Sequence, residues 1–413
     1  MSREPQHAVH ADPGGGGPPH AGNRGVLVVA FVTLLAIGTD LFVVSPLLPD
    51  IAHEFKVSAG TAGNSVTVFS VAYMVGAPFI GSLADRLGRR TVLMVGLVVF
   101  GLANVLTGLA PGFAVLLAAR ALAGLSAAAV TPSVQSLVGQ VAPSERRGSW
   151  MAVATAGFLI SLSVGAPAGT AVASWLSWRE TFVGLGVLAA VLAAVNLPAW
   201  PSKAGAVAAD ATQAGAERTA TLPAKVRAVS VTGLWAFAVY SLYTYVGTGL
   251  RDVAHLGTGA VATALFVYGI GAVAGSLSGG RLADRYGTGR VVIGSLLLLS
   301  VLEVVLDFAF HAPGPVLIAA LGLFALTAYP CLPAYQSRLV AAFPAGAGSV
   351  MAWNSCFMYL GTSLGAAAGG TLLSSAGFGW IAPSGAVVAL LGALVYSRWA
   401  LPRQPATVPA ATV

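Results

Sequence analysis

The sequence predicts an all-α integral membrane protein, with twelve transmembrane helices in two pseudo-symmetric bundles of six. Hydrophobic residues make up 56% of its 413 positions, so a soluble globule of this composition would lack the polar residues needed to cover its surface. Apolar runs of about 20 residues, the length that a helix needs to cross a hydrocarbon core, recur along the chain. A charged segment of ten residues occurs twice, each time between two such runs.

Each predicted helix corresponds to one apolar run. In chain order the expected spans are residues 26–48, 63–84, 91–110, 113–138, 149–173, 180–199, 229–249, 260–279, 290–310, 314–338, 347–373 and 379–400. Prolines and charged residues among small ones interrupt the pattern in the middle, which is typical of a flexible linker. The expected divisions are a disordered cytoplasmic tail (1–25), an N-terminal bundle (26–199), a cytoplasmic linker (200–228), a C-terminal bundle (229–400) and a cytoplasmic tail (401–413).

The two bundles are related in sequence at an offset near 200 residues. The charged segment Gly81–Arg90 returns as Gly280–Gly289 with six of the ten positions identical, and Pro132–Ser136 corresponds to Pro333–Ser337. Six spans follow six, so both bundles have the same orientation. The chain was therefore built by duplication.

The distribution of the bases gives the orientation in the membrane. With the amino terminus in the cytoplasm, 17 of the 21 lysines and arginines fall in cytoplasmic segments, Lys56, Arg179 and Arg251 fall outside, and Arg120 lies within a span. This is the positive-inside distribution. The formal charge of +7 is thus an orientation signal and not a nucleic-acid site. We expect a multi-pass protein of the cell membrane, surrounded by lipid, with both termini cytoplasmic.

The first copy of the charged segment is expected to form a sharply turned hairpin. Gly81 would let two helices approach closely, and Gly88 would permit a backbone conformation that is costly for other residues. Arg86, Arg89 and Arg90 would hold the loop in the cytoplasm.

Gly81–Arg90 fits, at every defined position, the signature between helices 2 and 3 of the major facilitator superfamily (Gly-x-Leu-Ala-Asp-Arg-x-Gly-Arg-Arg/Lys). The chain resembles this superfamily, specifically its twelve-helix drug:proton antiporter and sugar-efflux branch, over nearly its whole length beyond the tail. The resemblance implies two six-helix bundles that rock about a central cavity. It also implies a small-molecule substrate and a monomer.

Asp85 lies at a helix end, where the resemblance implies a latch. In the outward-facing state it would face the partly positive amino terminus of a helix from the other half. Arg89 and Arg90 fit equally well a role in topology alone. The second copy, in which Thr288 and Gly289 replace the two arginines, predicts a looser latch; its matching residues are Gly280, Asp284 and Arg285.

Two opposite charges are expected at similar depth in the membrane, Asp40 in the first span and Arg120 in the fourth. An ionised group there is costly unless it faces a partner or a wet cavity. The segment Gly38–Pro49 resembles the helix-1 acid region of proton-driven multidrug exporters, and Arg120–Gly124 matches their Arg-x-x-x-Gly motif. The resemblance makes Asp40 the candidate proton carrier and Arg120 its modulator. The alternative is a permanent ion pair that only joins two helices.

The fifth span resembles the antiporter signature of helix 5, through Gly165, Pro167 and Gly169, with Ala166 as a departure. Its small residues four apart would let two helices pack closely, and the proline would bend the helix. We therefore expect a close contact between this span and a neighbouring helix.

Two acids four residues apart, Glu303 and Asp307, lie on one face of the ninth span. In the superfamily this helix is peripheral. We therefore favour contact with outer water or with a neighbouring helix over a second proton site. Cys331 and Cys356 lie inside spans and are expected to pack as apolar residues.

Aromatic and amide groups gather on spans that the superfamily turns inward, and such surfaces bind flat, amphipathic molecules. The candidate substrate-binding residues are Tyr240, Tyr243, Tyr329, Trp353 and Asn354.

The expected function is export of a small organic compound, a drug, antibiotic or sugar-like metabolite, by proton antiport with alternating access. The alternative is a proton-coupled uptake symporter for a sugar or small metabolite. The sequence offers no nucleophile–base arrangement, no metal-ligand cluster and no phosphate-cradling loop. We therefore expect neither an enzyme nor an ATP-driven pump, and no cofactor or metal.

Overall fold

A computed structural model describes residues 24–143, 146–200, 222–343 and 347–399. Within these ranges every regular element is a helix, and twelve segments are long and apolar enough to cross a membrane, which confirms the predicted number of spans. The expected tails and most of the linker lie outside the described residues.

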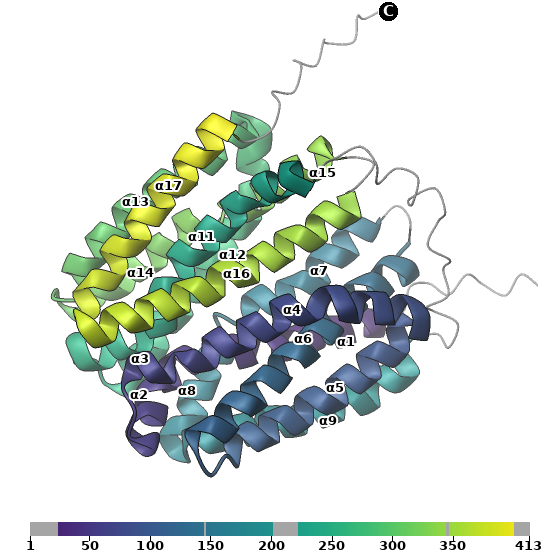
Figure 1. Ribbon diagram of the computed structural model, residues 1–413, viewed down its shortest axis with the longest axis horizontal. Helices are drawn as coiled ribbons and strands as arrows, with labels where there is room; N and C mark the ends of the chain where they lie inside the picture. The colour runs from purple at the N-terminus through teal and green to yellow at the C-terminus, as the bar shows by residue number, and fades with distance from the viewer. Residues whose placement is uncertain (1–23, 144–145, 201–221, 344–346, 400–413) are drawn as a thin grey trace, which may run out of the picture.

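The N-terminal half consists of α1 (Arg24–Phe42), α2 (Val44–Phe55), α3 (Ala59–Ala62), α4 (Asn64–Leu87), α5 (Arg89–Gly108), α6 (Phe113–Val141), α7 (Arg147–Ile160), α8 (Gly165–Trp175) and α9 (Trp178–Ala199). The C-terminal half consists of α11 (Leu222–Thr248), a π-helical turn η3 (Gly249–Val253), α12 (Thr258–Tyr286), α13 (Thr288–Ala309), α14 (Gly314–Ala328), α15 (Cys331–Ala342), α16 (Ala347–Ser375), η5 (Phe378–Trp380) and α17 (Ile381–Trp399). Figure 1 shows the two halves as separate bundles, with α4 and α16 side by side where they meet.

The helix α11 begins at Leu222, so residues 222–228 of the expected linker are helical. A proline is tolerated in the first turn of a helix, where its missing N–H has no intrahelical acceptor. Pro223 occupies this position. The Nζ atom of Lys225 donates a hydrogen bond to Ser349 Oγ of α16 at 3.0 Å, which holds the start of α11 against its neighbour.

Both copies of the charged segment form a turn of the expected kind. Gly88 separates α4 from α5 with φ +87° and ψ 138°, and Gly287 separates α12 from α13 with φ +85° and ψ 138°. We call the end of the molecule that holds these turns the hairpin end. The opposite end, with the turns at 56–58 and 254–257, is the far end. The space around Gly81 is open in this conformation, since no described atom lies within 4 Å of the position its Cβ would take.

We expect Gly88→Ala to lower the free energy of unfolding by about 1–3 kcal/mol, because only glycine adopts its backbone conformation without strain. Gly81→Ala is the matched control, since Gly81 lies within α4 and has open space around it. Apparent melting temperatures of the purified variants check this. A Gly88→Ala protein as stable as Gly81→Ala would contradict the expected strain.

Close packing of the fifth span against the first is confirmed. A Cβ on Gly157 would lie 2.2 Å from the carbonyl oxygen of Phe31, and one on Gly165 would lie 2.0 Å from Thr39 Oγ1. The span is interrupted at residues 161–164, between α7 and α8, with Pro167 in the first turn of α8. A similar approach of Gly169 to Val43, with the Cβ position 2.1 Å from its Cγ2 atom, extends the contact toward the far end.

Candidate functional site

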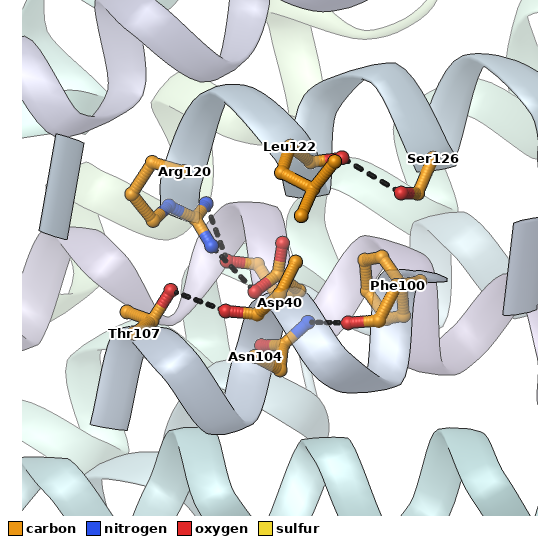
Figure 2. A network of polar contacts seen from close by, with 8 residues as sticks. Asp40, Phe100, Asn104, Thr107, Arg120, Leu122 and Ser126 are labelled. Carbon is orange, nitrogen blue, oxygen red and sulfur yellow. Dashed lines mark hydrogen bonds and ion pairs between the residues drawn. The ribbon is translucent and has the colours of Figure 1, made fainter. Parts of the chain in front are cut away.

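The predicted pair of opposite charges forms in the core of the N-terminal bundle. Arg120 Nη1, on α6, lies 2.6 Å from Asp40 Oδ1, on α1, and both side chains are shielded from solvent (Figure 2). Arg120 Nη2 also donates to the Asp40 carbonyl oxygen at 3.4 Å. The first and fourth spans therefore meet at one ion pair, as the depths of the two residues predicted.

Two aromatic rings and one glycine position the guanidinium. Its carbon lies 4.8 Å from the ring centroid of Phe69, on α4, and 5.5 Å from that of Phe182, on α9. Both contacts are within the range of cation–π attraction. Gly124, one turn beyond Arg120, is needed for this packing, since its Cβ would lie 2.2 Å from the Phe69 carbonyl oxygen. The Arg-x-x-x-Gly motif thus brings α4 against the charged turn of α6.

One oxygen of the carboxylate has unused hydrogen-bonding capacity. Asp40 Oδ2 is buried and has no hydrogen-bond partner among the described atoms, and the same is true of Asn104 Oδ1. Asn104, on α5, lies beside the pair and donates through Nδ2 to the Phe100 carbonyl oxygen at 3.0 Å (Figure 2). Asn104 was not among the residues predicted from the sequence, although an amide in an otherwise apolar span is a signal that points to it. Asp40 can accept a proton on Oδ2 without first losing a hydrogen bond.

Polar contacts join the two halves at the far end. Ser45 Oγ, on α2, donates to the Tyr243 carbonyl oxygen on α11 at 2.5 Å. Nearer the surface Arg251 Nη1, in η3, lies 2.8 Å from both carboxylate oxygens of Asp50, on α2. This ion pair is partly exposed and so contributes modestly to stability. Because it spans the halves, the far end is closed in this conformation.

Glycines bring the halves into backbone contact, at Gly60 near the same end and at Gly269 near the middle of α12. A Cβ on Gly60 would lie 2.2 Å from the Gly370 carbonyl oxygen of α16, and one on Gly269 would lie 2.3 Å from the backbone nitrogen of Ser163. Further along the interface the rings of Tyr73, on α4, and Tyr359, on α16, stack with centroids 3.7 Å apart. These contacts were not predicted from the sequence, because each pairs residues that lie far apart in the chain.

The candidate substrate-binding residues divide into two groups. The first group, Tyr240, Tyr243 and Tyr329, lies in a buried aromatic cluster in the C-terminal half. The ring of Tyr329 packs edge-to-face on Trp235 with centroids 5.5 Å apart. The ring of Tyr243 packs on Tyr268 with centroids 5.1 Å apart. This cluster meets the other half at Phe42, whose ring stacks with that of Tyr240 at 6.2 Å.

The second group lies nearer the hairpin end of α16. Asn354 is buried and accepts a hydrogen bond from Thr232 Oγ1 at 2.6 Å, while Trp353 packs against Phe357 at 6.5 Å. The ring contact of Trp353 and the hydrogen bond of Asn354 that the described residues show do not involve the tyrosine cluster. Asn354 instead joins α16 to α11.

The described residues of the two charged hairpins have different surroundings. Arg90 Nη2 donates to the Leu197 carbonyl oxygen at 2.5 Å, which ties the first hairpin to α9. Asp284 is exposed, and the guanidinium of Arg285 lies 5.3 Å from the ring centroid of Tyr286. The side chain of Asp85 lies outside the described part of the structure.

The two acids of the ninth span have different surroundings. Asp307 is partly exposed, and its Oδ1 atom lies 3.5 Å from the Cβ position of Gly379 at the far end. Glu303 is fully buried against the neighbouring helix α17. Contact with a neighbouring helix is confirmed for Glu303, and contact of Glu303 with outer water is not.

Known proteins resemble this chain over most of its length. The family model of the Major Facilitator Superfamily matches residues 30–275 and 229–412. The inner membrane transport protein YdhP of Escherichia coli (strain K12) is 31% identical over 388 residues, which cover 92% of this chain and 97% of the relative. A chloramphenicol resistance protein of Streptomyces lividans is 30% identical over 275 residues, 66% of this chain and 70% of the relative.

Among solved structures, that of a D-xylose-proton symporter has a TM-score of 0.77 at 18% identity, covering 92% of this chain and 98% of the other. A bacterial homologue of the human lysosomal transporter Spinster has a TM-score of 0.76 at 16% identity, covering 93% and 97%. At such identities the structural likeness supports the fold alone.

Proposed function

The chain belongs to the Major Facilitator Superfamily of membrane transporters, and from this membership we propose that it exports a small organic compound in exchange for protons. The observation that carries the proposal is the buried pair of Asp40 and Arg120. An ionisable residue inside a membrane span typically marks an ion or proton pathway. This acid joins two helices of the N-terminal bundle and keeps one carboxylate oxygen available.

The transport cycle uses both ends of the molecule. The positive-inside distribution of the bases supports a cytoplasmic hairpin end. On that orientation, the closed far end corresponds to a state that faces the cytoplasm. Opening the far end would break the hydrogen bond between Ser45 and Tyr243 and the ion pair between Asp50 and Arg251. Protons from outside would then reach Asp40, neutralise it and weaken its bond to Arg120, and the proton would be released on return to the cytoplasm-facing state.

Closure of the hairpin end in the outward-facing state would use the two charged hairpins, with Asp85 as the principal latch. The second copy, with an exposed Asp284, contributes less. The two closures alternate, and each state keeps one end sealed.

Export rather than uptake is favoured by two observations. Of the helix-5 motif residues, Gly165 and Gly169 bring α8 close to the first span, at Thr39 and Val43, which supports the likeness to the antiporter signature. In addition, one relative is a chloramphenicol resistance protein. The tyrosine cluster that meets Phe42 at the interface supports an aromatic, amphipathic substrate.

Expression in a drug-sensitive host tests this proposal. We expect raised resistance to at least one aromatic antibiotic or dye, and accumulation of that compound in inverted membrane vesicles when the lumen is made acidic. A collapsed proton gradient should abolish the accumulation. Uptake of a sugar into right-side-out vesicles on an inward proton gradient, without resistance to any compound, would instead establish the symporter.

A further inference from the structure

Glu303 is a carboxyl group without a partner in the core of the C-terminal bundle. The residue lies on α13, is 0% exposed, and neither of its carboxyl oxygens has a hydrogen-bond partner among the described atoms. Its Oε1 atom lies 2.7 Å from the position that a Cβ on Gly385 would take, and the Ala238 carbonyl oxygen of α11 lies 3.2 Å from the same position. The absence of a side chain on Gly385 therefore leaves the space that the carboxyl group occupies.

No described cation neutralises this group. The helix α14 carries no titratable side chain, and α17 carries its titratable groups, Tyr396 and Arg398, eleven or more residues beyond Gly385 toward the hairpin end. The titratable side chains of the other surrounding elements in the far half of the bundle and its middle are Asp307 on α13, Tyr240, Tyr243 and Tyr245 on α11, and Tyr268 on α12. Those toward the hairpin end are Arg290 on α13, Lys225 and Arg227 in the first turns of α11, Arg281, Asp284, Arg285 and Tyr286 in the last turns of α12, and Cys331, Tyr335 and Arg338 on α15. Arg290 is exposed and lies thirteen residues from Glu303, and Asp307 would add a second negative charge. The tyrosines supply hydroxyl groups but no positive charge.

We infer that Glu303 is a second proton-binding site, which holds a proton in the conformation with the far end closed. An unpaired carboxylate away from water is strongly unfavourable, whereas the neutral acid needs only to place one O–H. The pair in the N-terminal bundle differs, because Arg120 stabilises Asp40 as an anion. The two bundles thus hold one charged and one neutral acid in the same state.

The helix α11 connects this site to the interface between the halves. On one side, the Ala238 carbonyl oxygen lies near the Glu303 carboxyl group. On the other side, Tyr243 accepts a hydrogen bond from Ser45 at its carbonyl oxygen and packs edge-to-face on Phe42 at 5.6 Å. Opening the far end displaces α11 from α2 and changes the surroundings of Glu303. In the proposed cycle Glu303 takes up its proton from outside while that end is open, keeps it when the end closes, and then releases it to the cytoplasm. This part of the inference rests on the proposed transport cycle, whereas the protonated state of Glu303 does not.

Infrared difference spectroscopy on the purified, lipid-reconstituted protein tests the protonation directly, without a substrate. We expect the wild-type protein to show the C=O band of a protonated carboxylic acid at neutral pH, and this band to disappear on strongly alkaline titration. Glu303→Gln should lack the band, whereas Asp307→Asn and Asp40→Asn should retain it. Asp307→Asn is the matched control, since it removes an acid from the same face of α13.

Three results would overturn the inference: no such band in the wild-type protein, a band that survives in Glu303→Gln, or a band that disappears in Asp307→Asn. If Glu303→Gln does not fold, Glu303→Asp keeps the acid but shortens the side chain, and a shift of the band in that variant assigns it to position 303.

Transport assays distinguish a proton-binding role of Glu303 from a purely structural one. In vesicles we expect Glu303→Gln to lower gradient-driven transport by about tenfold or more while substrate exchange without a gradient persists, because a fixed neutral side chain cannot release a proton. Unchanged gradient-driven transport in Glu303→Gln would exclude a role in coupling. A wild-type protein that shows the band but no proton-driven transport would refute the proposed function and leave the site in place.

Discussion

Asp40→Asn is expected to abolish proton-driven transport, because an amide cannot bind and release a proton in the range where a carboxyl group does. The side chains have nearly the same shape, and the amide oxygen can still accept from Arg120 Nη1 as Asp40 Oδ1 does at 2.6 Å. Substrate exchange across the membrane without a gradient should therefore persist. Flux in proteoliposomes, measured with and without an imposed proton gradient, separates the two activities.

The same substitution should also destabilise the fold, and Arg120 explains why. Removing one partner of a buried ion pair costs about 3–5 kcal/mol, since the remaining charge is uncompensated. An arginine cannot lose its charge in a protein, whereas an aspartate left alone can bind a proton. We therefore expect Asp40→Asn to lower the melting temperature more than Arg120→Gln does, and the double variant to recover part of the loss.

The double variant is also the control for function. If Asp40→Asn fails only because the protein is unstable, the more stable double variant should regain proton-driven transport. We expect it to remain inactive. Gradient-driven transport by either variant that carries Asp40→Asn, at the wild-type rate, would exclude Asp40 as the proton carrier.

Much of the fold could be predicted from the sequence because membrane helices follow a local rule. Each span needs about 20 apolar residues regardless of what lies beside it, and the structure has the twelve helical segments that this rule predicts. The Asp40–Arg120 pair was predictable for a related reason: two opposite charges at equal depth in an apolar medium have few other ways to be stabilised.

The contacts between the halves could not be predicted in this way. Asp50 and Arg251 lie just beyond the ends of the predicted spans 26–48 and 229–249, where a solvated side chain is the usual state, and nothing local indicates that they meet. The sequence also does not show which aromatic residues pack together. Tyr240 and Trp353 both lie on spans expected to face inward, but Tyr240 packs on Trp235 and Trp353 packs on Phe357.

The closed far end leads to a second large expected effect: Gly269→Trp should stop transport with the far end held open. A side chain at Gly269 would begin 2.3 Å from the backbone nitrogen and 2.4 Å from the Cα of Ser163. Backbone atoms, unlike the end of a flexible side chain, cannot move aside locally, so the halves must separate. Gly60→Trp should have the same effect through a different pair of helices, since Gly60 meets the Gly370 carbonyl oxygen of α16.

Gly259→Trp is the matched control for this prediction. Gly259 lies on the same helix, α12, is exposed, and has no described atom within 4 Å of its Cβ position. We expect this variant to transport normally. A tryptophan on α12 is then harmful only where the halves touch.

Labelling of Ser45→Cys measures which end is open, in a background without Cys331 and Cys356. Ser45 is buried where α2 meets α11, so an impermeant maleimide added from outside should react slowly in the parent protein and in Gly259→Trp. It should react rapidly when Gly269→Trp or Gly60→Trp is present, while transport falls to background. A protected Ser45→Cys in both of these variants, with transport intact, would show that the far-end contact is not part of the cycle. Rapid labelling without transport would show that closure at this end is required for it, because each tryptophan blocks closure and leaves Asp40 and Arg120 unchanged.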